Sequence, residues 1–373
     1  MVKPSSLFPI GLALFAITAP ITACTLRDAV QGDTLRSQSQ QDGPWEEVGQ
    51  LPLSLESHQT VVLNDFVYVL GGWNETAGPY AEVFFTSLSP DGTLDDWQET
   101  AAMPLRLQHH AAVVHDGALY VLGGDNGFFD DSAVSDQIFR AIPSPEGDIT
   151  AWVEVGQLPA PLTIHAVTKV GNQIYVLGGS STFSSGTTVA DTVFTATISP
   201  EGKLGEFLPL TPFPTPIGWL TATAVGRHII AISGKTQFSP TRLTETIWRA
   251  EVDEGGQLSP FEAIATTVPR ERHATVLIGD TQIENTLVAI AGGGSDGVLD
   301  RVDAIAVDPQ GNIPGQRELA PLPEARYAHA AFAHDGYIYV SGGYLRYGSN
   351  ETSRKVFRLL YRASGSSQNA PGE

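Results

Sequence analysis

One short line recurs along this chain of 373 residues and limits what the chain can fold into. The stretch HAAVVHDGALYVLGGD begins at residue 110, and close variants begin at residues 58, 165 and 329. Each copy holds two short apolar runs that are separated by turn residues, and the second run ends in two glycines or their equivalent. Apolar runs between turn residues predict β-strands, and a recurring unit predicts a fold built from copies of one module.

The repeat unit contains four strand signals, which we name a, b, c and d. In the second unit they are HAAVV (110–114), ALYVLGG (118–124), QIFRAIPS (137–144) and TAWVEVGQL (150–158). Six units begin near residues 58, 110, 165, 220, 273 and 329. The last unit has no strand d after it, whereas the strand d signal PWEEVGQ at 44–50 has no unit before it. We therefore expect the N-terminal strand to complete the sixth unit, because an open ring would leave an unpaired edge.

A marker residue in strand d gives the period of the repeat. These positions lie 52 to 55 residues apart and are Trp45, Trp97, Trp152, Phe207, Phe261 and Gln316. A period of about 50 residues with a double glycine and a spaced aromatic resembles the kelch-repeat family, here over residues 44–362. The resemblance implies an all-β, six-bladed kelch-type β-propeller with four-stranded blades, in which the N-terminal strand closes the last blade. The marker aromatics are expected to pack between blades.

Two units depart from the repeat. Unit four has Leu220 in place of the histidine that opens strand a, and Ser233 in place of the first glycine. Unit five carries six extra residues between strands a and b, which predicts an elongated hairpin. Departures from an internal rule mark candidate functional or strained positions.

The N-terminal segment carries a different signature. Lys3 precedes the apolar stretch LFPIGLALFAITAP (7–20), which is too short and too rich in proline to span a bilayer as a helix, and ITAC follows. The segment resembles the bacterial lipoprotein signal, which ends in a lipid-accepting cysteine; an ordinary secretory signal is the alternative. The resemblance implies a signal peptide at 1–23 and a lipidated Cys24. It also implies an extracytoplasmic location in the bacterial cell envelope, in the periplasm or at the outer membrane or cell surface.

The flanking segments and the overall charge complete this picture. Residues 24–43 predict a flexible tether and residues 363–373 a disordered tail, because both are polar and lack periodicity. The chain has 21 basic and 41 acidic residues, for a formal charge of −20. This charge disfavours nucleic acid and anionic membrane surfaces as partners. Membrane contact is therefore expected only through the lipid.

The connections between strands sort onto two faces. The a–b and c–d turns are short and acidic, with only Lys203 and Arg227 as basic residues. The b–c and d–a loops are longer, and we call the face that they form the loop face. It combines arginines with aromatic rings, a composition typical of sugar or carboxylate recognition and of binding hot spots. The predicted ligand-binding residues are Trp219, Arg272, Arg326, Tyr327, Tyr344 and Arg346. The alternative is that these arginines only balance nearby carboxylates.

Metal and cofactor sites are not indicated. Five histidines open strand a, and we expect them to bond neighbouring blades rather than bind a metal; they are His58, His110, His165, His273 and His329. Asp125, Asp130 and Asp131 lack the regular spacing of a calcium loop, and calcium there stays open. Galactose oxidase, a kelch enzyme, uses a tyrosine–cysteine crosslink at copper. The single cysteine here belongs to the signal, which excludes that chemistry. No cofactor is expected.

Two main functions remain open. The first is a lipid-anchored binding module that presents the loop face to a glycan or a protein. The second is a sugar-processing enzyme similar to the periplasmic sialic acid mutarotases (N-acetylneuraminate epimerases), which also resemble six-bladed kelch propellers. That reading needs a cationic grip on a carboxylate and an acid–base pair, for which Arg272 or Arg326 with Glu271 or Glu324 are candidates. A structural part of an envelope complex is a third possibility.

Overall fold

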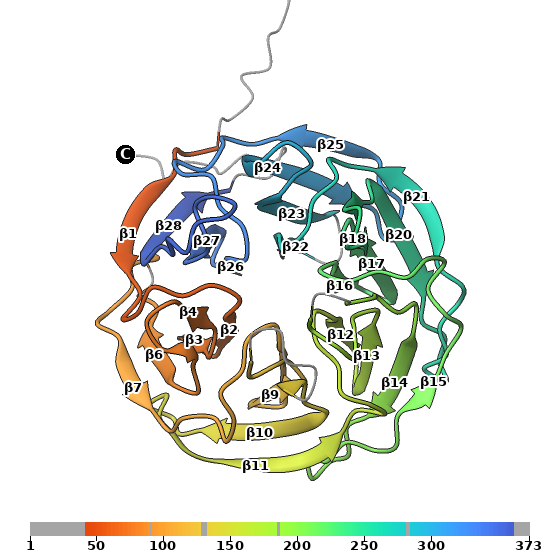
Figure 1. Ribbon diagram of the computed structural model, residues 1–373, viewed down its shortest axis with the longest axis horizontal. Helices are drawn as coiled ribbons and strands as arrows, with labels where there is room; N and C mark the ends of the chain where they lie inside the picture. Colours follow the sequence, from red (N-terminus) through yellow and green to blue (C-terminus); the bar gives the residue numbers. More distant parts are fainter. Residues whose placement is uncertain (1–41, 90, 128–132, 185–186, 281–283, 362–373) are drawn as a thin grey trace, which may run out of the picture. The chain divides into compact units, whose positions relative to one another are not determined.

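Six four-stranded antiparallel sheets surround a central axis in the computed structural model, which describes residues 42–89, 91–127, 133–184, 187–280 and 284–361 (Figure 1). Every regular element of the described residues is a β-strand. The architecture is the predicted six-bladed β-propeller. The predicted signal peptide, Cys24 and the C-terminal tail lie outside the described residues.

Each blade runs from an inner strand a to an outer strand d. Blade 1 consists of β2 (Gln59–Leu63), β3 (Phe66–Leu70), β6 (Val83–Ser87) and β7 (Gln98–Thr100). Blade 2 consists of β8 (Ala111–His115), β9 (Ala118–Leu122), β10 (Gln137–Pro143) and β11 (Ile149–Gln157). Blade 3 consists of β12 (Ala166–Val170), β13 (Gln173–Leu177), β14 (Val193–Thr197) and β15 (Leu208–Pro209).

The second half of the ring repeats this order. Blade 4 consists of β16 (Thr221–Val225), β17 (His228–Ile232), β20 (Thr246–Glu251) and β21 (Glu262–Thr266). Blade 5 consists of β22 (Ala274–Asp280), β23 (Glu284–Gly293), β24 (Val298–Val307) and β25 (Gly315–Glu318). Its first two strands are longer than those of the other blades, which confirms the predicted elongated hairpin. Two small hairpins decorate b–c loops: β4 (Trp73–Asn74) with β5 (Gly78–Pro79), and β18 (Lys235–Gln237) with β19 (Arg242–Leu243).

The N-terminal strand closes the ring. β1 (Glu46–Gln50) pairs antiparallel with β28 (Lys355–Leu360), and the sixth blade continues with β27 (Tyr337–Ser341) and β26 (Ala330–His334). The pairing extends just past β1, where the Leu51 backbone N–H donates to the Arg354 carbonyl at 2.7 Å. The prediction that the two ends of the propeller share one blade is confirmed.

Hydrogen bonds between blades explain the repeated aromatic residues. The hydroxyl of Tyr339 in blade 6 donates to the Gly92 carbonyl in the c–d turn of blade 1. Tyr68, in blade 1, donates in the same way to the next blade, at Gly147. The strand-d marker Trp152 donates its indole N–H to the Ala101 carbonyl of the preceding blade at 2.9 Å. The expected role in blade packing is therefore confirmed for Trp152.

The first glycine of each pair is required by the neighbouring blade. At Gly123, where φ is +60°, an added Cβ would lie 2.4 Å from the Leu162 carbonyl oxygen of blade 3. Ser233 occupies the equivalent position of blade 4 with φ of +51°, and its hydroxyl accepts from the Arg270 N–H at 2.7 Å. Ser233 therefore adds a side-chain hydrogen bond to the neighbouring blade. The glycines at this position only come close to that blade's backbone.

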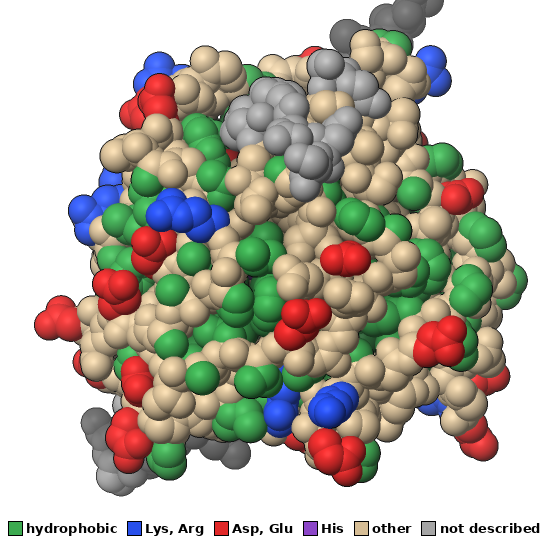
Figure 2. Space-filling model, turned by 60° about the horizontal axis from the view of Figure 1, so that its bottom comes forward, with side chains coloured by type: hydrophobic (Ala, Val, Ile, Leu, Met, Phe, Trp, Pro, Cys, Tyr) green, Lys and Arg blue, Asp and Glu red, His purple; other side chains and the backbone are tan. Residues whose placement is uncertain are grey.

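The charge of the chain is spread over its surface. Figure 2 shows acidic side chains distributed over the visible face, where they outnumber scattered basic ones. This matches the formal charge of −20. The distribution of surface charge therefore does not by itself indicate a binding site for an anionic ligand.

Candidate functional site

Six residues, one from each blade, form a rim around the axis on the loop face. Each directly precedes a strand a, and all have positive φ between 49° and 56°. Their backbone groups connect neighbouring blades: the Ser57 N–H donates to the Ala328 carbonyl, and the Trp219 N–H to the Ile164 carbonyl. The rim residues are Ser57, His109, Ile164, Trp219, Arg272 and Ala328. The repeated backbone thus fixes where six variable side chains stand.

A cavity of about 230 Å³ lies inside the rim. All six rim residues line it, and so do the five histidines that open strand a. Beside the rim, an isolated β-bridge pairs two further residues of each blade. Examples are Gln108 with Asp125 and Gly218 with Lys235. These bridges join the residue before the rim residue to the residue after the double glycine. Variable side chains on a rigid ring of backbone are where a binding site is expected.

Arg272 is the arginine of the rim, and it has no carboxylate partner within the described residues. Its guanidinium carbon lies 3.9 Å from the ring centre of Trp219 and 5.7 Å from that of Tyr327. No hydrogen bond or ion pair joins this guanidinium to another residue in the part of the chain that the structure describes. Stacking on aromatic rings fixes the guanidinium while its N–H donors stay available. The arrangement can accept a carboxylate.

Glu271 does not neutralise Arg272, although the two residues are adjacent in sequence. Its carboxylate oxygen lies 3.1 Å from the Lys235 ammonium nitrogen, and both side chains are at least nine-tenths buried. The same ammonium lies 4.7 Å from the ring centre of Phe238. Lys235 is thus occupied by Glu271.

Replacing Lys235 with Met should destabilise the protein by about 3 kcal/mol, because breaking a buried pair leaves one charge uncompensated. Urea unfolding of the variant measures this loss. The double variant Lys235→Met with Glu271→Met should recover most of it, since no buried charge then remains. A single variant as stable as the native chain would contradict the buried pairing.

Glu56 adds a second acid near the rim. It is 1% exposed, and the Ser57 hydroxyl donates a hydrogen bond to its carboxylate. Burial raises the pKa of this carboxyl, while the nearby charges of His109 and Arg272 partly oppose the rise. A raised pKa favours the protonated form of a carboxyl, which can donate a proton.

Three of the predicted aromatic ligand residues gather with Arg272. Tyr327 and Tyr344 stack with ring centres 5.2 Å apart, and Trp219 lies beneath Arg272. Tyr344 and Tyr327 are largely buried, at 5% and 7% exposure. The structure therefore brings Trp219, Arg272, Tyr327 and Tyr344 together where the rim passes blades 4 to 6.

The other two predicted residues lie elsewhere. Arg326 is fully buried, donates to the Gly342 carbonyl at 2.8 Å and pairs with Glu324. Arg346 is exposed, pairs with Glu351 at 2.7 Å and does not line the cavity. For both arginines, the alternative of balancing a nearby carboxylate describes what the structure shows.

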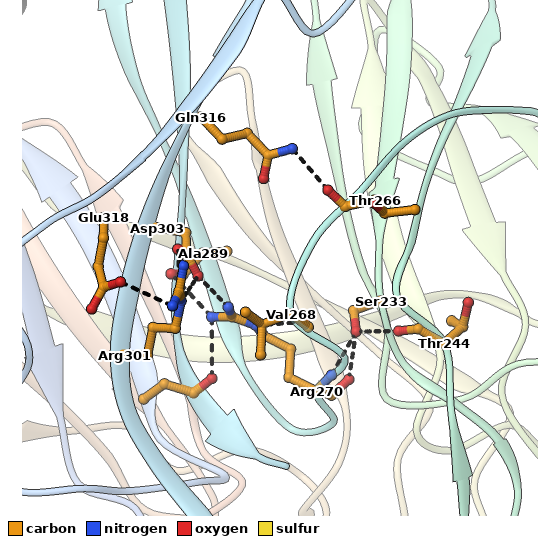
Figure 3. Close-up of polar contacts among 11 residues, drawn as sticks. Ser233, Thr244, Thr266, Val268, Arg270, Ala289, Arg301, Asp303, Gln316 and Glu318 are labelled. Carbon is orange, nitrogen blue, oxygen red and sulfur yellow. Dashed lines mark hydrogen bonds and ion pairs between the residues drawn. The ribbon is translucent and has the colours of Figure 1, made fainter. Parts of the chain in front are cut away.

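An alignment of the six repeats with one another predicts that Arg326 is buried in the core. Its position, three residues before the strand-a histidine, is a buried Leu or Ile in blades 1 to 4: Leu55, Leu107, Leu162 and Ile217. Arg270 occupies the same position in blade 5 and pairs with Asp303, which also binds Arg301 (Figure 3). Both arginines therefore replace core residues.

The remaining predictions concern metals and histidines. His58 lies 3.1 Å from the Ser341 hydroxyl of the neighbouring blade, and His273 lies 3.0 Å from that of Thr221. Bonding between blades is confirmed for these two histidines. Across the described ranges, no three His, Cys, Asp or Glu side chains form a group that could hold a metal ion. Asp130 and Asp131 of the possible calcium loop lie outside the described residues.

Sequence reasoning missed His109 and the role of Asp125. The His109 Nδ1 lies 2.8 Å from an Asp125 carboxylate oxygen, and both side chains are buried beside the rim. The available signal was that His109 precedes a strand-a histidine and Asp125 follows a double glycine. Both are positions at which the six repeats differ.

Comparisons with known proteins agree with this architecture. Beta-scruin of Limulus polyphemus is 28% identical over 34% of this chain and 13% of its own length. Kelch repeat and BTB domain-containing protein 12 of Homo sapiens is 28% identical over 43% of this chain and 25% of its own length. A horsepox virus protein, Kelch repeat and BTB domain-containing protein 1, is 30% identical over 32% of this chain and 20% of its own length. The chain is thus similar to kelch-repeat proteins, and its fold is a six-bladed β-propeller.

The propeller also has a solved structural neighbour. The structure of YjhT superposes with a TM-score of 0.64 at 14% identity, covering 83% of this chain and 95% of that one. At this identity the likeness shows the fold alone. No family model matches the chain. The matched segments span only 13% to 25% of these kelch-repeat relatives' own lengths. Among the described residues, no helix combines the length and apolarity needed to cross a membrane.

Proposed function

We propose that this propeller is a binding module that takes a carboxylate-bearing sugar of a glycan at the rim, with Arg272 as the anchor. The observation that carries the proposal is the Arg272 guanidinium, which stacks on Trp219, lines the cavity and has no carboxylate partner among the described residues. Arginine binds carboxylates through two parallel N–H donors, and aromatic rings pack against the apolar faces of sugars. Lys235 supports this role of Arg272 because its ammonium forms an ion pair with Glu271, the carboxylate next to Arg272 in sequence.

The cellular setting is part of the same proposal. A lipid on Cys24 and a polar tether would hold the propeller at the bacterial cell envelope, outside the cytoplasm. A propeller displayed in this way would meet glycans or proteins of the envelope or of the surroundings. The rim favours the glycan, since its cavity suits one sugar residue better than a protein surface.

The test is to titrate the protein with N-acetylneuraminate, glucuronate and neutral galactose and to measure binding by calorimetry or NMR. The two acids should bind and galactose should bind much more weakly. Arg272→Met should lower the affinity for the acids by about 30-fold or more, because a desolvated charge pair is lost. Arg346→Met is the matched control, since Arg346 is exposed and outside the cavity. Equal affinity in Arg272→Met and the native chain would exclude the rim as the site.

The mutarotase is a second candidate, and one observation favours it. Glu56 and Arg272 lie close enough for the arginine to lower the pKa of the carboxyl against the effect of burial. A carboxyl whose pKa is raised by burial, near an arginine, is the kind of pair that this chemistry requires. Glu324 and Arg326 do not line the cavity, and Glu56 borders it only through its neighbour Ser57, which does.

A further inference from the structure

Blade 5 lacks an aromatic ring that every other blade has in strand c. In each blade, one residue of strand c pairs with the strand-b residue that stands two positions before the double glycine or its replacement. Blade 5 has Asp303 at this position, opposite Ala289. The other five blades have a large aromatic residue there: Phe84, Phe139, Phe194, Trp248 and Phe357. A packing position has thus become a carboxylate in blade 5 alone.

Two further packing positions of blade 5 differ from the repeat. Arg270 stands where blades 1 to 4 have a buried Leu or Ile, and Gln316 stands where the other blades have the strand-d marker aromatic. The Gln316 side-chain amide donates to the Thr266 carbonyl at 2.8 Å. It therefore keeps the hydrogen bond that Trp152 makes in blade 2, but not the ring. The boundary between blades 4 and 5 has lost two rings that the other boundaries keep.

A second cavity, which we call the blade-5 pocket, lies at this boundary and has a volume of about 130 Å³. An engineered cavity of roughly 150 Å³ in another protein binds benzene, so the pocket has the size for one aromatic ring. All four residues of β25 are exposed, so a ligand can reach the pocket from the outer side of the ring of blades. The pocket is lined by Thr267 and Val268 from the loop after β21, Arg301 and Asp303 of β24, and Gln316, Arg317 and Glu318 of β25.

The charges of Asp303, Arg301 and Glu318 are paired with one another. Asp303 accepts hydrogen bonds from both Arg270 and Arg301, and the Arg301 guanidinium also lies 2.9 Å from Glu318 (Figure 3). Carboxylates thus engage the N–H groups of Arg301 in the plane of its guanidinium. This arrangement disfavours a further anion and leaves the faces of the guanidinium for stacking.

Other contacts in this chain show that arginines near this place pack against rings. In blade 6, Arg326 occupies the position of Arg270, and its guanidinium carbon lies 4.9 Å from the ring centre of Phe357, the strand-c ring that blade 5 lacks. Arg317, which lines the pocket, lies 5.3 Å from the ring centre of Tyr361. Cation–π attraction therefore favours a ring as the occupant of the blade-5 pocket.

Thr267 adds a polar atom that needs a partner. Its hydroxyl oxygen is buried and has no hydrogen-bond partner among the described residues. A buried hydroxyl without a partner is unfavourable, because it has given up its hydrogen bonds to water. A ligand that carries an N–H or O–H group beside its ring would supply the missing hydrogen bond.

We propose that the blade-5 pocket is a second binding site, which takes an aromatic ring with a hydrogen-bond donor, an indole or a phenol. The ring would fill the space that the chain's own aromatic residues fill at the other blade boundaries. None of the residues that line the pocket lines the axial cavity, so the inference is independent of the function proposed for the rim. Such a ring comes either from a small molecule or from a side chain of a partner polypeptide.

The experiment titrates the native chain with phenol, indole, cyclohexanol and benzene and follows the methyl NMR signals of Val268. Phenol and indole should cause saturable shifts. Cyclohexanol, which has no aromatic face, should bind about two- to fivefold more weakly than phenol. Benzene, which has no donor, should bind about two- to tenfold more weakly. N-acetyltryptophanamide identifies the source of the ring: binding tighter than that of indole assigns a side chain of a polypeptide, and weaker binding assigns a small molecule.

Gln316→Trp should abolish the binding of phenol and indole, because the chain's own ring then fills the pocket. Gln98→Trp is the matched control, since Gln98 is an exposed strand-d residue of blade 1 outside the pocket. It should bind as the native chain does. Thr267→Val serves as a second variant if Gln316→Trp fails to fold. It should weaken the binding of phenol about two- to tenfold and leave that of benzene unchanged, because only the hydroxyl is lost.

Two results would overturn the inference. Native chain that shows no saturable shift with phenol or indole would mean that the pocket holds only water. Shifts that persist in Gln316→Trp and remain unaltered in Thr267→Val would place the ring at some other part of the protein. Neither result would bear on Arg272 and the rim, which the acidic sugars test separately.

Discussion

Removing residues 42–52 should lower the free energy of unfolding by about 5 kcal/mol or more. The deletion takes away β1, the outer strand of blade 6, together with the fully buried Leu51. Losing one buried leucine costs about 2–5 kcal/mol by itself, and the ladder with β28 is lost as well. Urea unfolding of chains that begin at residue 42 and at residue 53 measures the difference.

A matched comparison isolates the strand from the segment before it. Trimming the chain from residue 25 to residue 42 should change the stability little, because the predicted tether precedes the first strand. Equal unfolding midpoints for the chains beginning at 42 and 53 would show that β1 does not hold the ring closed. Such a result would contradict the pairing of β1 with β28.

The repeat predicted the fold because it records backbone demands. Gly123 recurs as a glycine in most units since a Cβ there would collide with the next blade. The strand-d marker Trp152 donates its indole N–H to the backbone of the preceding blade. Both demands follow from the ring, so each unit repeats them. Strand order, blade number and closure could all be derived from this record.

The site was only partly predictable because it lies where the repeats differ. Arg272, Trp219, Tyr327 and Tyr344 were selected by residue type and do meet at the rim. Arg326 was selected by the same reasoning, yet its repeat position faces the core. Residue type alone does not distinguish an arginine at the rim from one that replaces a buried leucine.

His109 shows a different limit of sequence reasoning. Its partner Asp125 follows it by 16 residues, and a third group, Thr163, comes from the next blade. The left-handed backbone at the rim brings these positions together, and that conformation is adopted there by residues as different as Ile164 and Arg272. Because this backbone conformation is independent of residue type, no local sequence pattern predicts it.

Acid should destabilise this protein steeply below about pH 6.5. The five histidines that open strand a are buried and line the axial cavity. Burial lowers the pKa of His58 and of His110 to about 3 and that of His165 to about 4. The pKa values of His273 and His329 are also well below the usual 6.5, again because of burial.

The sign of the effect follows from proton uptake. The unfolded chain protonates these histidines near pH 6.5. The folded chain leaves His58, His110 and His165 neutral until about pH 3 to 4, and burial also lowers the pKa values of His273 and His329 well below 6.5. Unfolding therefore takes up protons in this window, and stability present above pH 6.5 is lost as the pH falls. Each histidine contributes about 1.4 kcal/mol per pH unit, so five contribute up to about 7 kcal/mol per unit. Urea unfolding at intervals between pH 7 and pH 5 measures this slope.

His165→Leu is the variant that attributes the slope to the histidines. Leucine should pack at this position, since blade 4 has the buried Leu220 there, and neither ring nitrogen of His165 has a hydrogen-bond partner within the described residues. Between pH 7 and pH 5 the variant should lose about 2 kcal/mol less stability than the native chain, because one proton-binding group is missing from the unfolded state. The comparison concerns only the change with pH, so any packing difference at pH 7 cancels. Parallel stability curves for the two chains would mean that His165 is protonated in the folded protein, and the axial cavity would then have to hold charge rather than exclude it.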